Sequence, residues 1–118
     1  MKTSTRCVQL GRGHDAYGAI VPPIYQTATF EQPAATEFGE YDYTRSGNPT
    51  RTVLEEQLAD LEDANHACAF ASGMAALTAL TRIVKAGEEI IAGDDLYGGT
   101  VRLLDRLASH HNIFRSLR

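Results

Sequence analysis

The stretch that decides the fold reads His66-Ala67-Cys68-Ala69-Phe70-Ala71-Ser72-Gly73-Met74-Ala75-Ala76-Leu77. An apolar run reaches a Ser-Gly pair and continues into helix-favouring residues, which predicts a buried strand, a tight turn and the start of a helix. The backbone N–H groups of Gly73 and Met74 have no partner inside that helix, and the helix dipole adds positive potential there. Such a helix end binds anions, most naturally a phosphate. Ser-Gly before a helix is also an ordinary N-cap, so the pattern leaves both functions open.

The composition fits one globular domain with a core of its own. The chain has 118 residues, of which 43% are hydrophobic and 22% charged, and its net charge is −4. The basic residues form no run, which argues against a nucleic-acid or anionic-membrane partner. Arg82 and Lys85 interrupt the longest apolar stretch, and no secretory h-region follows the N-terminus. Cys7 and Cys68 make no disulfide framework, so we expect a cytoplasmic protein in which Cys68 is a small buried hydrophobe.

Residues 1–50 differ in kind from the rest of the chain. Three of the four prolines lie before residue 48, and apart from a short helical turn expected around Thr5–Leu10, no helical periodicity is sustained there. Pro22-Pro23 forces an extended backbone on the residues before them. A segment of this length without a core needs a surface to lie against. It is therefore either a flexible leader or an arm that embraces a second subunit.

From residue 48 onward, helical and strand patterns alternate. Thr52–Glu55 matches a capping box, and Leu54, Leu58 and Leu61 predict an amphipathic helix of about three turns. The further elements expected are a helix over Gly73–Lys85, a buried strand over Glu89–Gly93, a helix over Thr100–Ser109 and a strand over Ile113–Leu117. Apolar strands alternating with helices predict an α/β fold, with a mostly parallel sheet covered on both faces. Ligands of such sheets bind beyond the C-terminal strand ends, where Ser72-Gly73 and residues 94–100 are both expected.

The most unusual part of the chain is Tyr41-Asp42-Tyr43-Thr44-Arg45-Ser46-Gly47-Asn48-Pro49-Thr50. In an extended backbone, Tyr43 and Arg45 project from the same side. A phenol beside a guanidinium makes a phosphate clamp, because arginine offers forked donors and tyrosine adds a hydroxyl donor. The alternative is an exposed loop whose tyrosine covers a nearby helix.

A second aromatic candidate lies in Asp94-Asp95-Leu96-Tyr97-Gly98-Gly99-Thr100. Tyr97 can stack on a flat heteroaromatic ring in the room that the glycines leave, or it can simply cover the sheet edge. Asp94 and Asp95 are candidates for metal ligands or an acid/base pair, but loop carboxylates near the start of a helix explain them more simply. The four histidines show no metal-site spacing, so we expect no metal.

Lysine is scarce in this chain. Lys2 and Lys85 are the only two, and Lys85 closes a predicted helix at the opposite edge of the sheet from the ligand crevice. Neither is placed to form a Schiff base in that crevice. The chain also lacks a Gly-x-Ser-x-Gly elbow, a Walker A motif and a Gly-x-Gly-x-x-Gly motif.

Together these stretches resemble the pyridoxal 5′-phosphate (PLP) enzymes of cysteine and methionine metabolism, the trans-sulfuration family. The resemblance covers about residues 22–107 and rests on four motifs in order, namely Pro22–Phe30, Tyr41–Thr50, Ala71–Ala76 and Gly93–Gly99. The sequences of these motifs are most similar to those of cystathionine β-lyases of the plant type, and the γ-lyases and γ-synthases differ little from them in these motifs. The resemblance implies an extended N-terminal arm over residues 1–50. It also implies that residues 51–118 begin the PLP-binding large domain of the fold type I transferases, with the domain truncated.

The resemblance also implies roles for individual residues. In that family a Ser-Gly-Met turn donates backbone N–H groups to the cofactor phosphate. A Tyr-x-Arg motif reaches the phosphate of the neighbouring subunit's cofactor, and another tyrosine stacks on the pyridine ring. The cofactor-binding residues implied here are, in that order, Ser72, Gly73 and Met74, then Tyr43 and Arg45, then Tyr97. The family further implies a homotetramer built from dimers, with the arm packed on the partner subunit.

The catalytic half of the family's site is expected to lie outside this chain. Its Schiff-base lysine, the aspartate that pairs with the pyridine nitrogen and the arginine that holds the substrate carboxylate find no counterparts here. We therefore expect no catalytic residue among these 118, little cofactor binding and no turnover by the chain alone. The implied function is a carbon–sulfur lyase of methionine biosynthesis that cleaves cystathionine at Cβ–S. The alternatives are γ-elimination or γ-replacement, and a non-catalytic truncated product that associates with full-length subunits.

Overall fold

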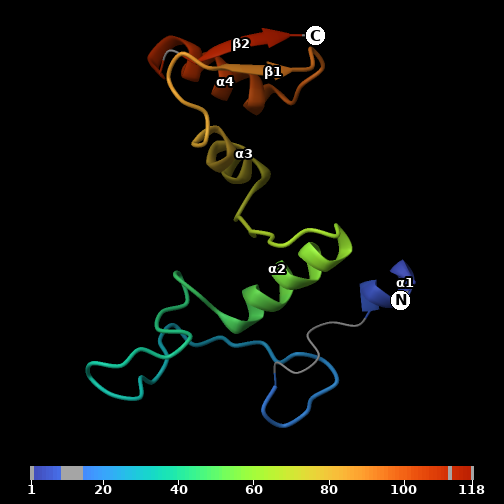
Figure 1. Ribbon diagram of the computed structural model, residues 1–118, viewed down its shortest axis with the longest axis vertical. Coiled ribbons are helices and arrows are strands. Elements are labelled where there is room, and N and C mark those ends of the chain that lie inside the picture. The colour runs from blue at the N-terminus through green and yellow to red at the C-terminus, as the bar shows by residue number, and fades with distance from the viewer. Residues whose placement is uncertain (1, 9–14, 112, 118) are drawn as a thin grey trace. The chain divides into compact units, whose positions relative to one another are not determined.

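The computed structural model describes residues 2–8, 15–111 and 113–117 (Figure 1). The chain forms two compact units, Met1–Ala69 and Phe70–Arg118. The first unit contains α1 (Thr3–Val8) and α2 (Pro49–Leu61), and the second contains α3 (Gly73–Thr81), β1 (Glu89–Ala92), α4 (Gly98–His111) and β2 (Phe114–Leu117). The boundary between the compact units follows residue 69. The predicted boundary at residue 50 separates an inter-subunit arm from a cofactor-binding domain, which is a division by function, and it stays a prediction. None of the helices described is long and apolar enough to cross a membrane.

The first unit is held together by α1 lying beside α2 (Figure 1). Arg6 Nε of α1 pairs with Asp60 Oδ2 at 2.8 Å, and Gln57 Nε2 of α2 donates to the carbonyl of Arg6 at 2.6 Å. An exposed ion pair of this kind is screened by water and contributes little to stability. The start of the chain therefore docks on a helix of the same chain.

The N-terminus of α2 is set by Asn48 rather than by Thr52. The side-chain oxygen of Asn48 accepts from the N–H of Thr50 at 2.8 Å, and Pro49 takes the first helical position, where its missing N–H costs nothing. The capping box predicted at Thr52 was wrong, because the N–H of residue 52 already donates to the Asn48 carbonyl at 3.0 Å. An asparagine followed by a proline is typical of a helix start, so this cap could have been predicted from Asn48-Pro49.

The buried face of α2 differs from the leucine stripe that the sequence predicts. Val53 and Ala59 are buried, whereas Leu54 remains 49% exposed and Leu58 40% exposed. The heptad-like spacing of the leucines correctly predicted the helix, but within this chain a different stripe faces the rest of the unit.

Within residues 15–47, two backbone segments are hydrogen-bonded to each other in an antiparallel arrangement. An antiparallel bridge joins Thr29 to Tyr43, the N–H of Phe30 donates to the Asp42 carbonyl at 2.9 Å, and the N–H of Thr44 donates to the Ala28 carbonyl at 2.9 Å. These bonds fix the register of residues 41–44 against residues 28–30. The Tyr-x-Arg segment is therefore presented by a paired backbone.

Tyr41 gives the first unit a predicted pH dependence. Its ring packs against Phe30 with centroids 5.6 Å apart, its hydroxyl is hydrogen-bonded to Thr52 Oγ1 at 3.0 Å, and burial raises the pKa of the Tyr41 phenol above its ordinary value. A raised folded-state pKa contributes stability that is complete below the unfolded pKa of about 10 and is lost as pH rises through the folded value. We expect the urea midpoint of the first unit to fall between about pH 8 and about pH 11, and to fall less in Tyr41→Phe. Equal falls in the two proteins would contradict this.

The strand predicted before Ser72 does not form. Residues 66–71 are irregular, and Cys68, expected to be buried, is exposed. A strand is defined by hydrogen bonds to a neighbour, and none of the described segments forms a ladder with this one. The N–H of Ala69 donates to Glu55 Oε1 at 2.8 Å instead.

In the second unit, α3 begins at Gly73 as predicted but ends at Thr81 rather than at Lys85. The N–H groups of residues 82–84 each donate to the carbonyl three residues earlier, which tightens and ends the helix. The N–H of Lys85 then donates to the Glu88 carboxylate at 2.7 Å, and Gly87 turns the chain with φ +90°.

The predicted parallel sheet is present as one pair of strands. β1 and β2 run parallel, with Glu89 opposite Phe114 and Ala92 opposite Leu117, and α4 connects them and packs on β2 (Figure 1). Among the side chains whose burial is described, Leu104 and Ile113 form the apolar core of this unit. β1 was predicted to be buried, but Ile91 is 60% exposed, because no further strand or helix covers that face among the described residues.

Candidate functional site

The N-terminus of α3 is capped and open. Ser72 has an extended backbone, and its Oγ accepts from the N–H of Ala75 at 3.1 Å, so the ordinary N-cap is present. The N–H groups of Gly73 and Met74 precede the first intrahelical bond and have no acceptor within the helix. A Cβ built on Gly73 meets nothing within 4 Å. The cap therefore leaves two backbone donors at the positive end of the helix in reach of an anion.

The ring of Tyr97 lies beside this helix end. A Cβ built on Gly99 comes within 2.5 Å of Tyr97 Cε1 and 3.0 Å of Met74 Sδ, so both side chains touch the bare backbone of that buried glycine. Thr100 Oγ1 is 4.0 Å from the same sulfur. The Tyr97 ring remains 72% exposed. An aromatic plane and an open helix N-terminus thus come together where α4 begins.

Tyr43 and Arg45 lie together, but the extended backbone from which this was predicted was wrong, because residues 43–47 form a turn in which the N–H groups of Ser46 and Gly47 donate to the Tyr43 carbonyl. The guanidinium carbon of Arg45 is 5.2 Å from the centroid of the Tyr43 ring, within cation–π range. Both side chains are exposed. The pair can therefore offer a phenol hydroxyl and forked guanidinium donors to the same anion.

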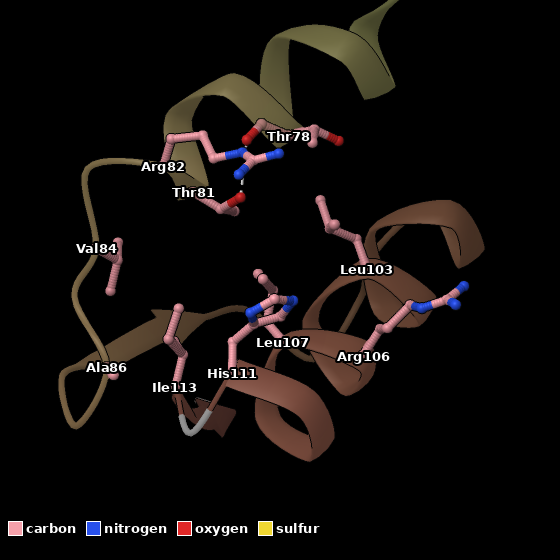
Figure 2. Close-up of a pocket in the computed structure, with 10 residues that line it drawn as sticks. All are labelled: Thr78, Thr81, Arg82, Val84, Ala86, Leu103, Arg106, Leu107, His111 and Ile113. Atoms are coloured by element: carbon pink, nitrogen blue, oxygen red, sulfur yellow. Dashed lines mark hydrogen bonds between the residues drawn. The ribbon is translucent and has the colours of Figure 1, made fainter.

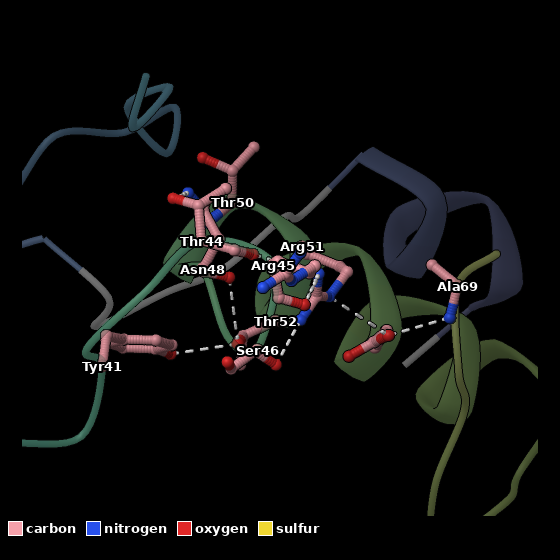
Figure 3. Close-up of polar contacts among 10 residues, drawn as sticks. Tyr41, Thr44, Arg45, Ser46, Asn48, Thr50, Arg51, Thr52 and Ala69 are labelled. Atoms are coloured by element: carbon pink, nitrogen blue, oxygen red, sulfur yellow. Dashed lines mark hydrogen bonds and ion pairs between the residues drawn. The ribbon is translucent and has the colours of Figure 1, made fainter. Parts of the chain in front are cut away.

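Two residues that sequence reasoning missed hold the loop that carries this pair (Figure 3). Asn48 is buried, and its Nδ2 donates to the Tyr25 carbonyl and to Thr44 Oγ1, each at 3.1 Å. Arg51 reaches the carbonyls of residues 44–46. The asparagine could have been found as a helix cap. The sequence marks the arginine only by its i,i+4 spacing to Glu55, because its partners in the loop are backbone atoms.

The six predicted cofactor residues fall in two groups. The second unit brings together Ser72, Gly73, Met74 and Tyr97, and the first brings together Tyr43 and Arg45. The remaining candidates do not add to either group. Asp94 and Asp95 are exposed loop residues, and no metal-binding cluster occurs among the residues that the structure describes. Lys85 lies beyond the C-terminus of α3, a helix about 13 Å long that has Gly73 at its other end.

A separate cavity of about 370 Å³ lies in the second unit, away from the helix N-terminus (Figure 2). Its lining comes from the C-terminal half of α3, the loop that follows, α4 and the residue before β2, and consists of Thr78, Thr81, Arg82, Val84, Ala86, Leu103, Arg106, Leu107, His111 and Ile113. Figure 2 shows leucine, valine and isoleucine side chains around the space, whereas Arg106 extends away from it. The cavity has a mixed lining, because Thr78, Thr81, Arg82 and His111 also border it, and it contains none of the predicted cofactor residues.

Comparison with known proteins identifies the family to which the chain belongs. Residues 4–117 match the family described as Cys/Met metabolism PLP-dependent enzyme. The chain belongs to this family. Its members bind pyridoxal phosphate, and the open N–H groups of α3 beside an exposed aromatic ring fit a flat ring that carries a phosphate.

Individual relatives are enzymes that act on cystathionine. The chain is 54% identical over 110 residues to the chloroplastic cystathionine β-lyase of Arabidopsis thaliana, covering 93% of this chain and 24% of that protein. It is 44% identical over 114 residues to the cystathionine γ-lyase of Dictyostelium discoideum, covering 95% of this chain and 30% of that protein. The chain thus spans about a quarter to a third of these relatives.

The fold is that of the corresponding part of solved family members. The crystal structure of cystathionine γ-synthase from Xanthomonas oryzae pv. oryzae in complex with cystathionine matches with a TM-score of 0.89 and 35% identity, covering 99% of this chain and 31% of that one. The chain therefore has the architecture of the N-terminal region of a fold type I PLP enzyme.

Proposed function

We propose that this chain forms the cofactor-anchoring part of a PLP-dependent carbon–sulfur lyase that cleaves cystathionine by β-elimination. The observation that carries the proposal is the open N-terminus of α3 beside the Tyr97 ring, in a chain that is 54% identical to a cystathionine β-lyase. When bound, pyridoxal phosphate supplies an electron sink for a carbanion at the carbon next to the amino group. The residues of this chain hold and orient that group.

Each cofactor residue has a distinct task in this proposal. Gly73 and Met74 donate backbone N–H groups to the phosphate, and Ser72 keeps the helix end in shape by capping Ala75. Tyr97 stacks on the pyridine ring and limits its tilt. Tyr43 and Arg45 bind the phosphate held by a neighbouring subunit, since their side chains are exposed and paired.

The assembly implied by this function is larger than the two units. We propose that β1 and β2 belong to a bigger, mostly parallel sheet covered by helices, because Leu80, Ile83 and Ile91 are exposed apolar side chains on and beside these elements. A homotetramer built from dimers, with residues 1–50 as the arm between subunits, is part of the same proposal. So is a cytoplasmic location, which the free thiols of Cys7 and Cys68 support.

Binding of a cofactor analogue tests the phosphate site directly. Pyridoxine 5′-phosphate carries the ring and the phosphate but no aldehyde, so lysines cannot capture it covalently. We expect it to bind the chain weakly but saturably, and pyridoxine without the phosphate to bind at least about tenfold more weakly still, a difference of about 1.4 kcal/mol. Isothermal titration of both ligands measures this. Equal affinities would remove the phosphate site from the proposal.

The keto acid released from cystathionine distinguishes the reaction types. β-Elimination gives pyruvate, and γ-elimination gives 2-oxobutyrate. γ-Cleavage is the second candidate because the chain is 44% identical to a γ-lyase. We expect pyruvate from the lysine-bearing enzyme that contains this chain, and no product from the 118 residues alone, whose lysines Lys2 and Lys85 lie at neither group of cofactor residues. Release of 2-oxobutyrate instead would favour the γ-lyase, and turnover by the isolated chain would contradict the proposed division of the site.

A further inference from the structure

Arg51 contacts three consecutive residues of the Tyr-x-Arg loop (Figure 3). Its Nη2 donates to the carbonyl of Ser46 at 2.6 Å, and its Nη1 lies 3.3 Å from the carbonyl of Thr44 and 3.4 Å from that of Arg45. A single guanidinium thus binds three consecutive carbonyls of the loop. The side chain of Arg51 is itself only partly exposed.

The loop needs such a cation because of its shape. The N–H groups of Ser46 and Gly47 both donate to the carbonyl of Tyr43, at 2.9 and 3.0 Å, which closes one tight turn. The carbonyls of the following residues are then left in the position of those in the last turn of a helix, where they have no intrahelical partner. A positive group is favourable at such an end, and bonds from a charged donor are about twice as strong as neutral ones.

Glu55 holds the guanidinium in place from the other side. It lies one turn further along α2, its Oε1 is 3.8 Å from Arg51 Nε, and the same oxygen accepts from the N–H of Ala69 at 2.8 Å. Ala69 stands three residues before Ser72 in the sequence. The Arg51–Glu55 pair therefore links the loop that bears Tyr43 and Arg45 to the last residue of the first unit.

We propose that Arg51 is a positioning residue for the phosphate clamp. It holds the turn of residues 43–47 in the shape that keeps the Tyr43 ring and the Arg45 guanidinium together, with Glu55 as its counter-ion. The inference rests on the proposed function, since it takes the Tyr43–Arg45 pair to be a phosphate ligand. A lysine cannot replace this residue fully, because its compact ammonium lacks the planar fork that spans several carbonyls.

Two measurements on the ¹⁵N-labelled chain test the inference. The first is amide hydrogen exchange at Ser46 and Gly47, which reports the closed turn. The second is a titration with inorganic phosphate followed at the side-chain N–H of Arg45. We expect Arg51→Gln to speed both exchange rates about tenfold and to weaken phosphate binding at Arg45 about tenfold, with Arg51→Lys between the two proteins. Arg106→Gln, which removes an exposed arginine of α4, should leave both readouts unchanged.

A double variant separates positioning from a general loss of structure. If Arg51 acts through Arg45, adding Arg51→Gln to Arg45→Gln should weaken phosphate binding no further, and in the variants that lack Arg45 the titration is followed at the backbone N–H of Ser46 and Gly47. If the Arg51→Gln protein loses its helical circular dichroism signal and is therefore unfolded, the Arg51→Lys protein is used for the test in its place, because lysine keeps the charge and the aliphatic stem. Unchanged exchange or unchanged phosphate affinity in a folded Arg51 variant would overturn the role of Arg51. A wild-type Arg45 that shows no response to phosphate would overturn the proposed clamp instead, so the two failures are distinguishable.

Discussion

Replacing Asn48 with alanine should destabilise the first unit by about 2–3 kcal/mol. About 1 kcal/mol is the usual cost of losing an N-cap side chain, here the acceptor of the Thr50 N–H. A further 1–2 kcal/mol, roughly, comes from leaving buried groups without their donor, namely the Tyr25 carbonyl and the Thr44 hydroxyl. The residue is only 6% exposed, so water cannot easily replace these bonds.

Asn48→Ser is the matched control for that variant. Serine keeps an oxygen that can cap α2 but offers no amide N–H₂, so it should lose only the second part of the free energy. Urea unfolding followed by tyrosine fluorescence measures both, because Tyr97 alone among the five tyrosines lies outside residues 1–69. If Asn48→Ala and Asn48→Ser were equally stable, the amide donors would contribute nothing and the argument would be wrong.

Gly99→Ala should weaken cofactor binding without unfolding the second unit. The new Cβ would come within 2.5 Å of Tyr97 Cε1 and 3.0 Å of Met74 Sδ, so one or both side chains must move. The Tyr97 ring is 72% exposed and can swing away, and methionine is flexible, so the clash is relieved cheaply. Alanine also favours a helix over glycine by up to about 1 kcal/mol. The stability should therefore change by less than about 1 kcal/mol while the stacking plane is displaced.

The expected result is an affinity for pyridoxine 5′-phosphate that falls about tenfold, the equivalent of one aromatic stacking contact. Gly98→Ala is the control, because its Cβ meets only Arg102 Nη1 at an ordinary 3.5 Å. It makes the same chemical change one residue earlier in α4 and should bind like the wild type. Titration calorimetry compares the three proteins. Equal affinities for Gly99→Ala and Gly98→Ala would show that the position of the Tyr97 ring does not matter for binding.

Local signals predicted most of the second unit. The Ser72-Gly73 pair correctly placed the start of α3, and the apolar runs around residues 90 and 115 correctly placed two parallel strands. Tyr43 and Arg45 do lie together, but they do so across a tight turn and not along the extended backbone that the spacing argument assumed. These signals succeed because they depend on interactions within a few residues, namely capping, alternation and apolar periodicity.

Failures occurred where a feature depends on a distant partner. Residues 66–71 have the composition of a buried strand, but a strand exists only when a neighbour completes its hydrogen bonds. Cys68 and Ile91 were expected to be buried for the same reason, and both are exposed, because burial is a property of what packs on a residue. Amphipathic spacing likewise predicted α2 but not which stripe of it would be covered.

The sequence by itself determined the family, the order of the helices and the residues suited to a phosphate and a flat ring, because motif chemistry is written in consecutive residues. Only the tertiary structure revealed how those residues are held. The glycine surface that Tyr97 and Met74 share, and the three carbonyls that Arg51 binds, join groups whose identity carries no sequence signal. Backbone carbonyls and bare Cα atoms are the same in every residue, so their partners are decided by the fold.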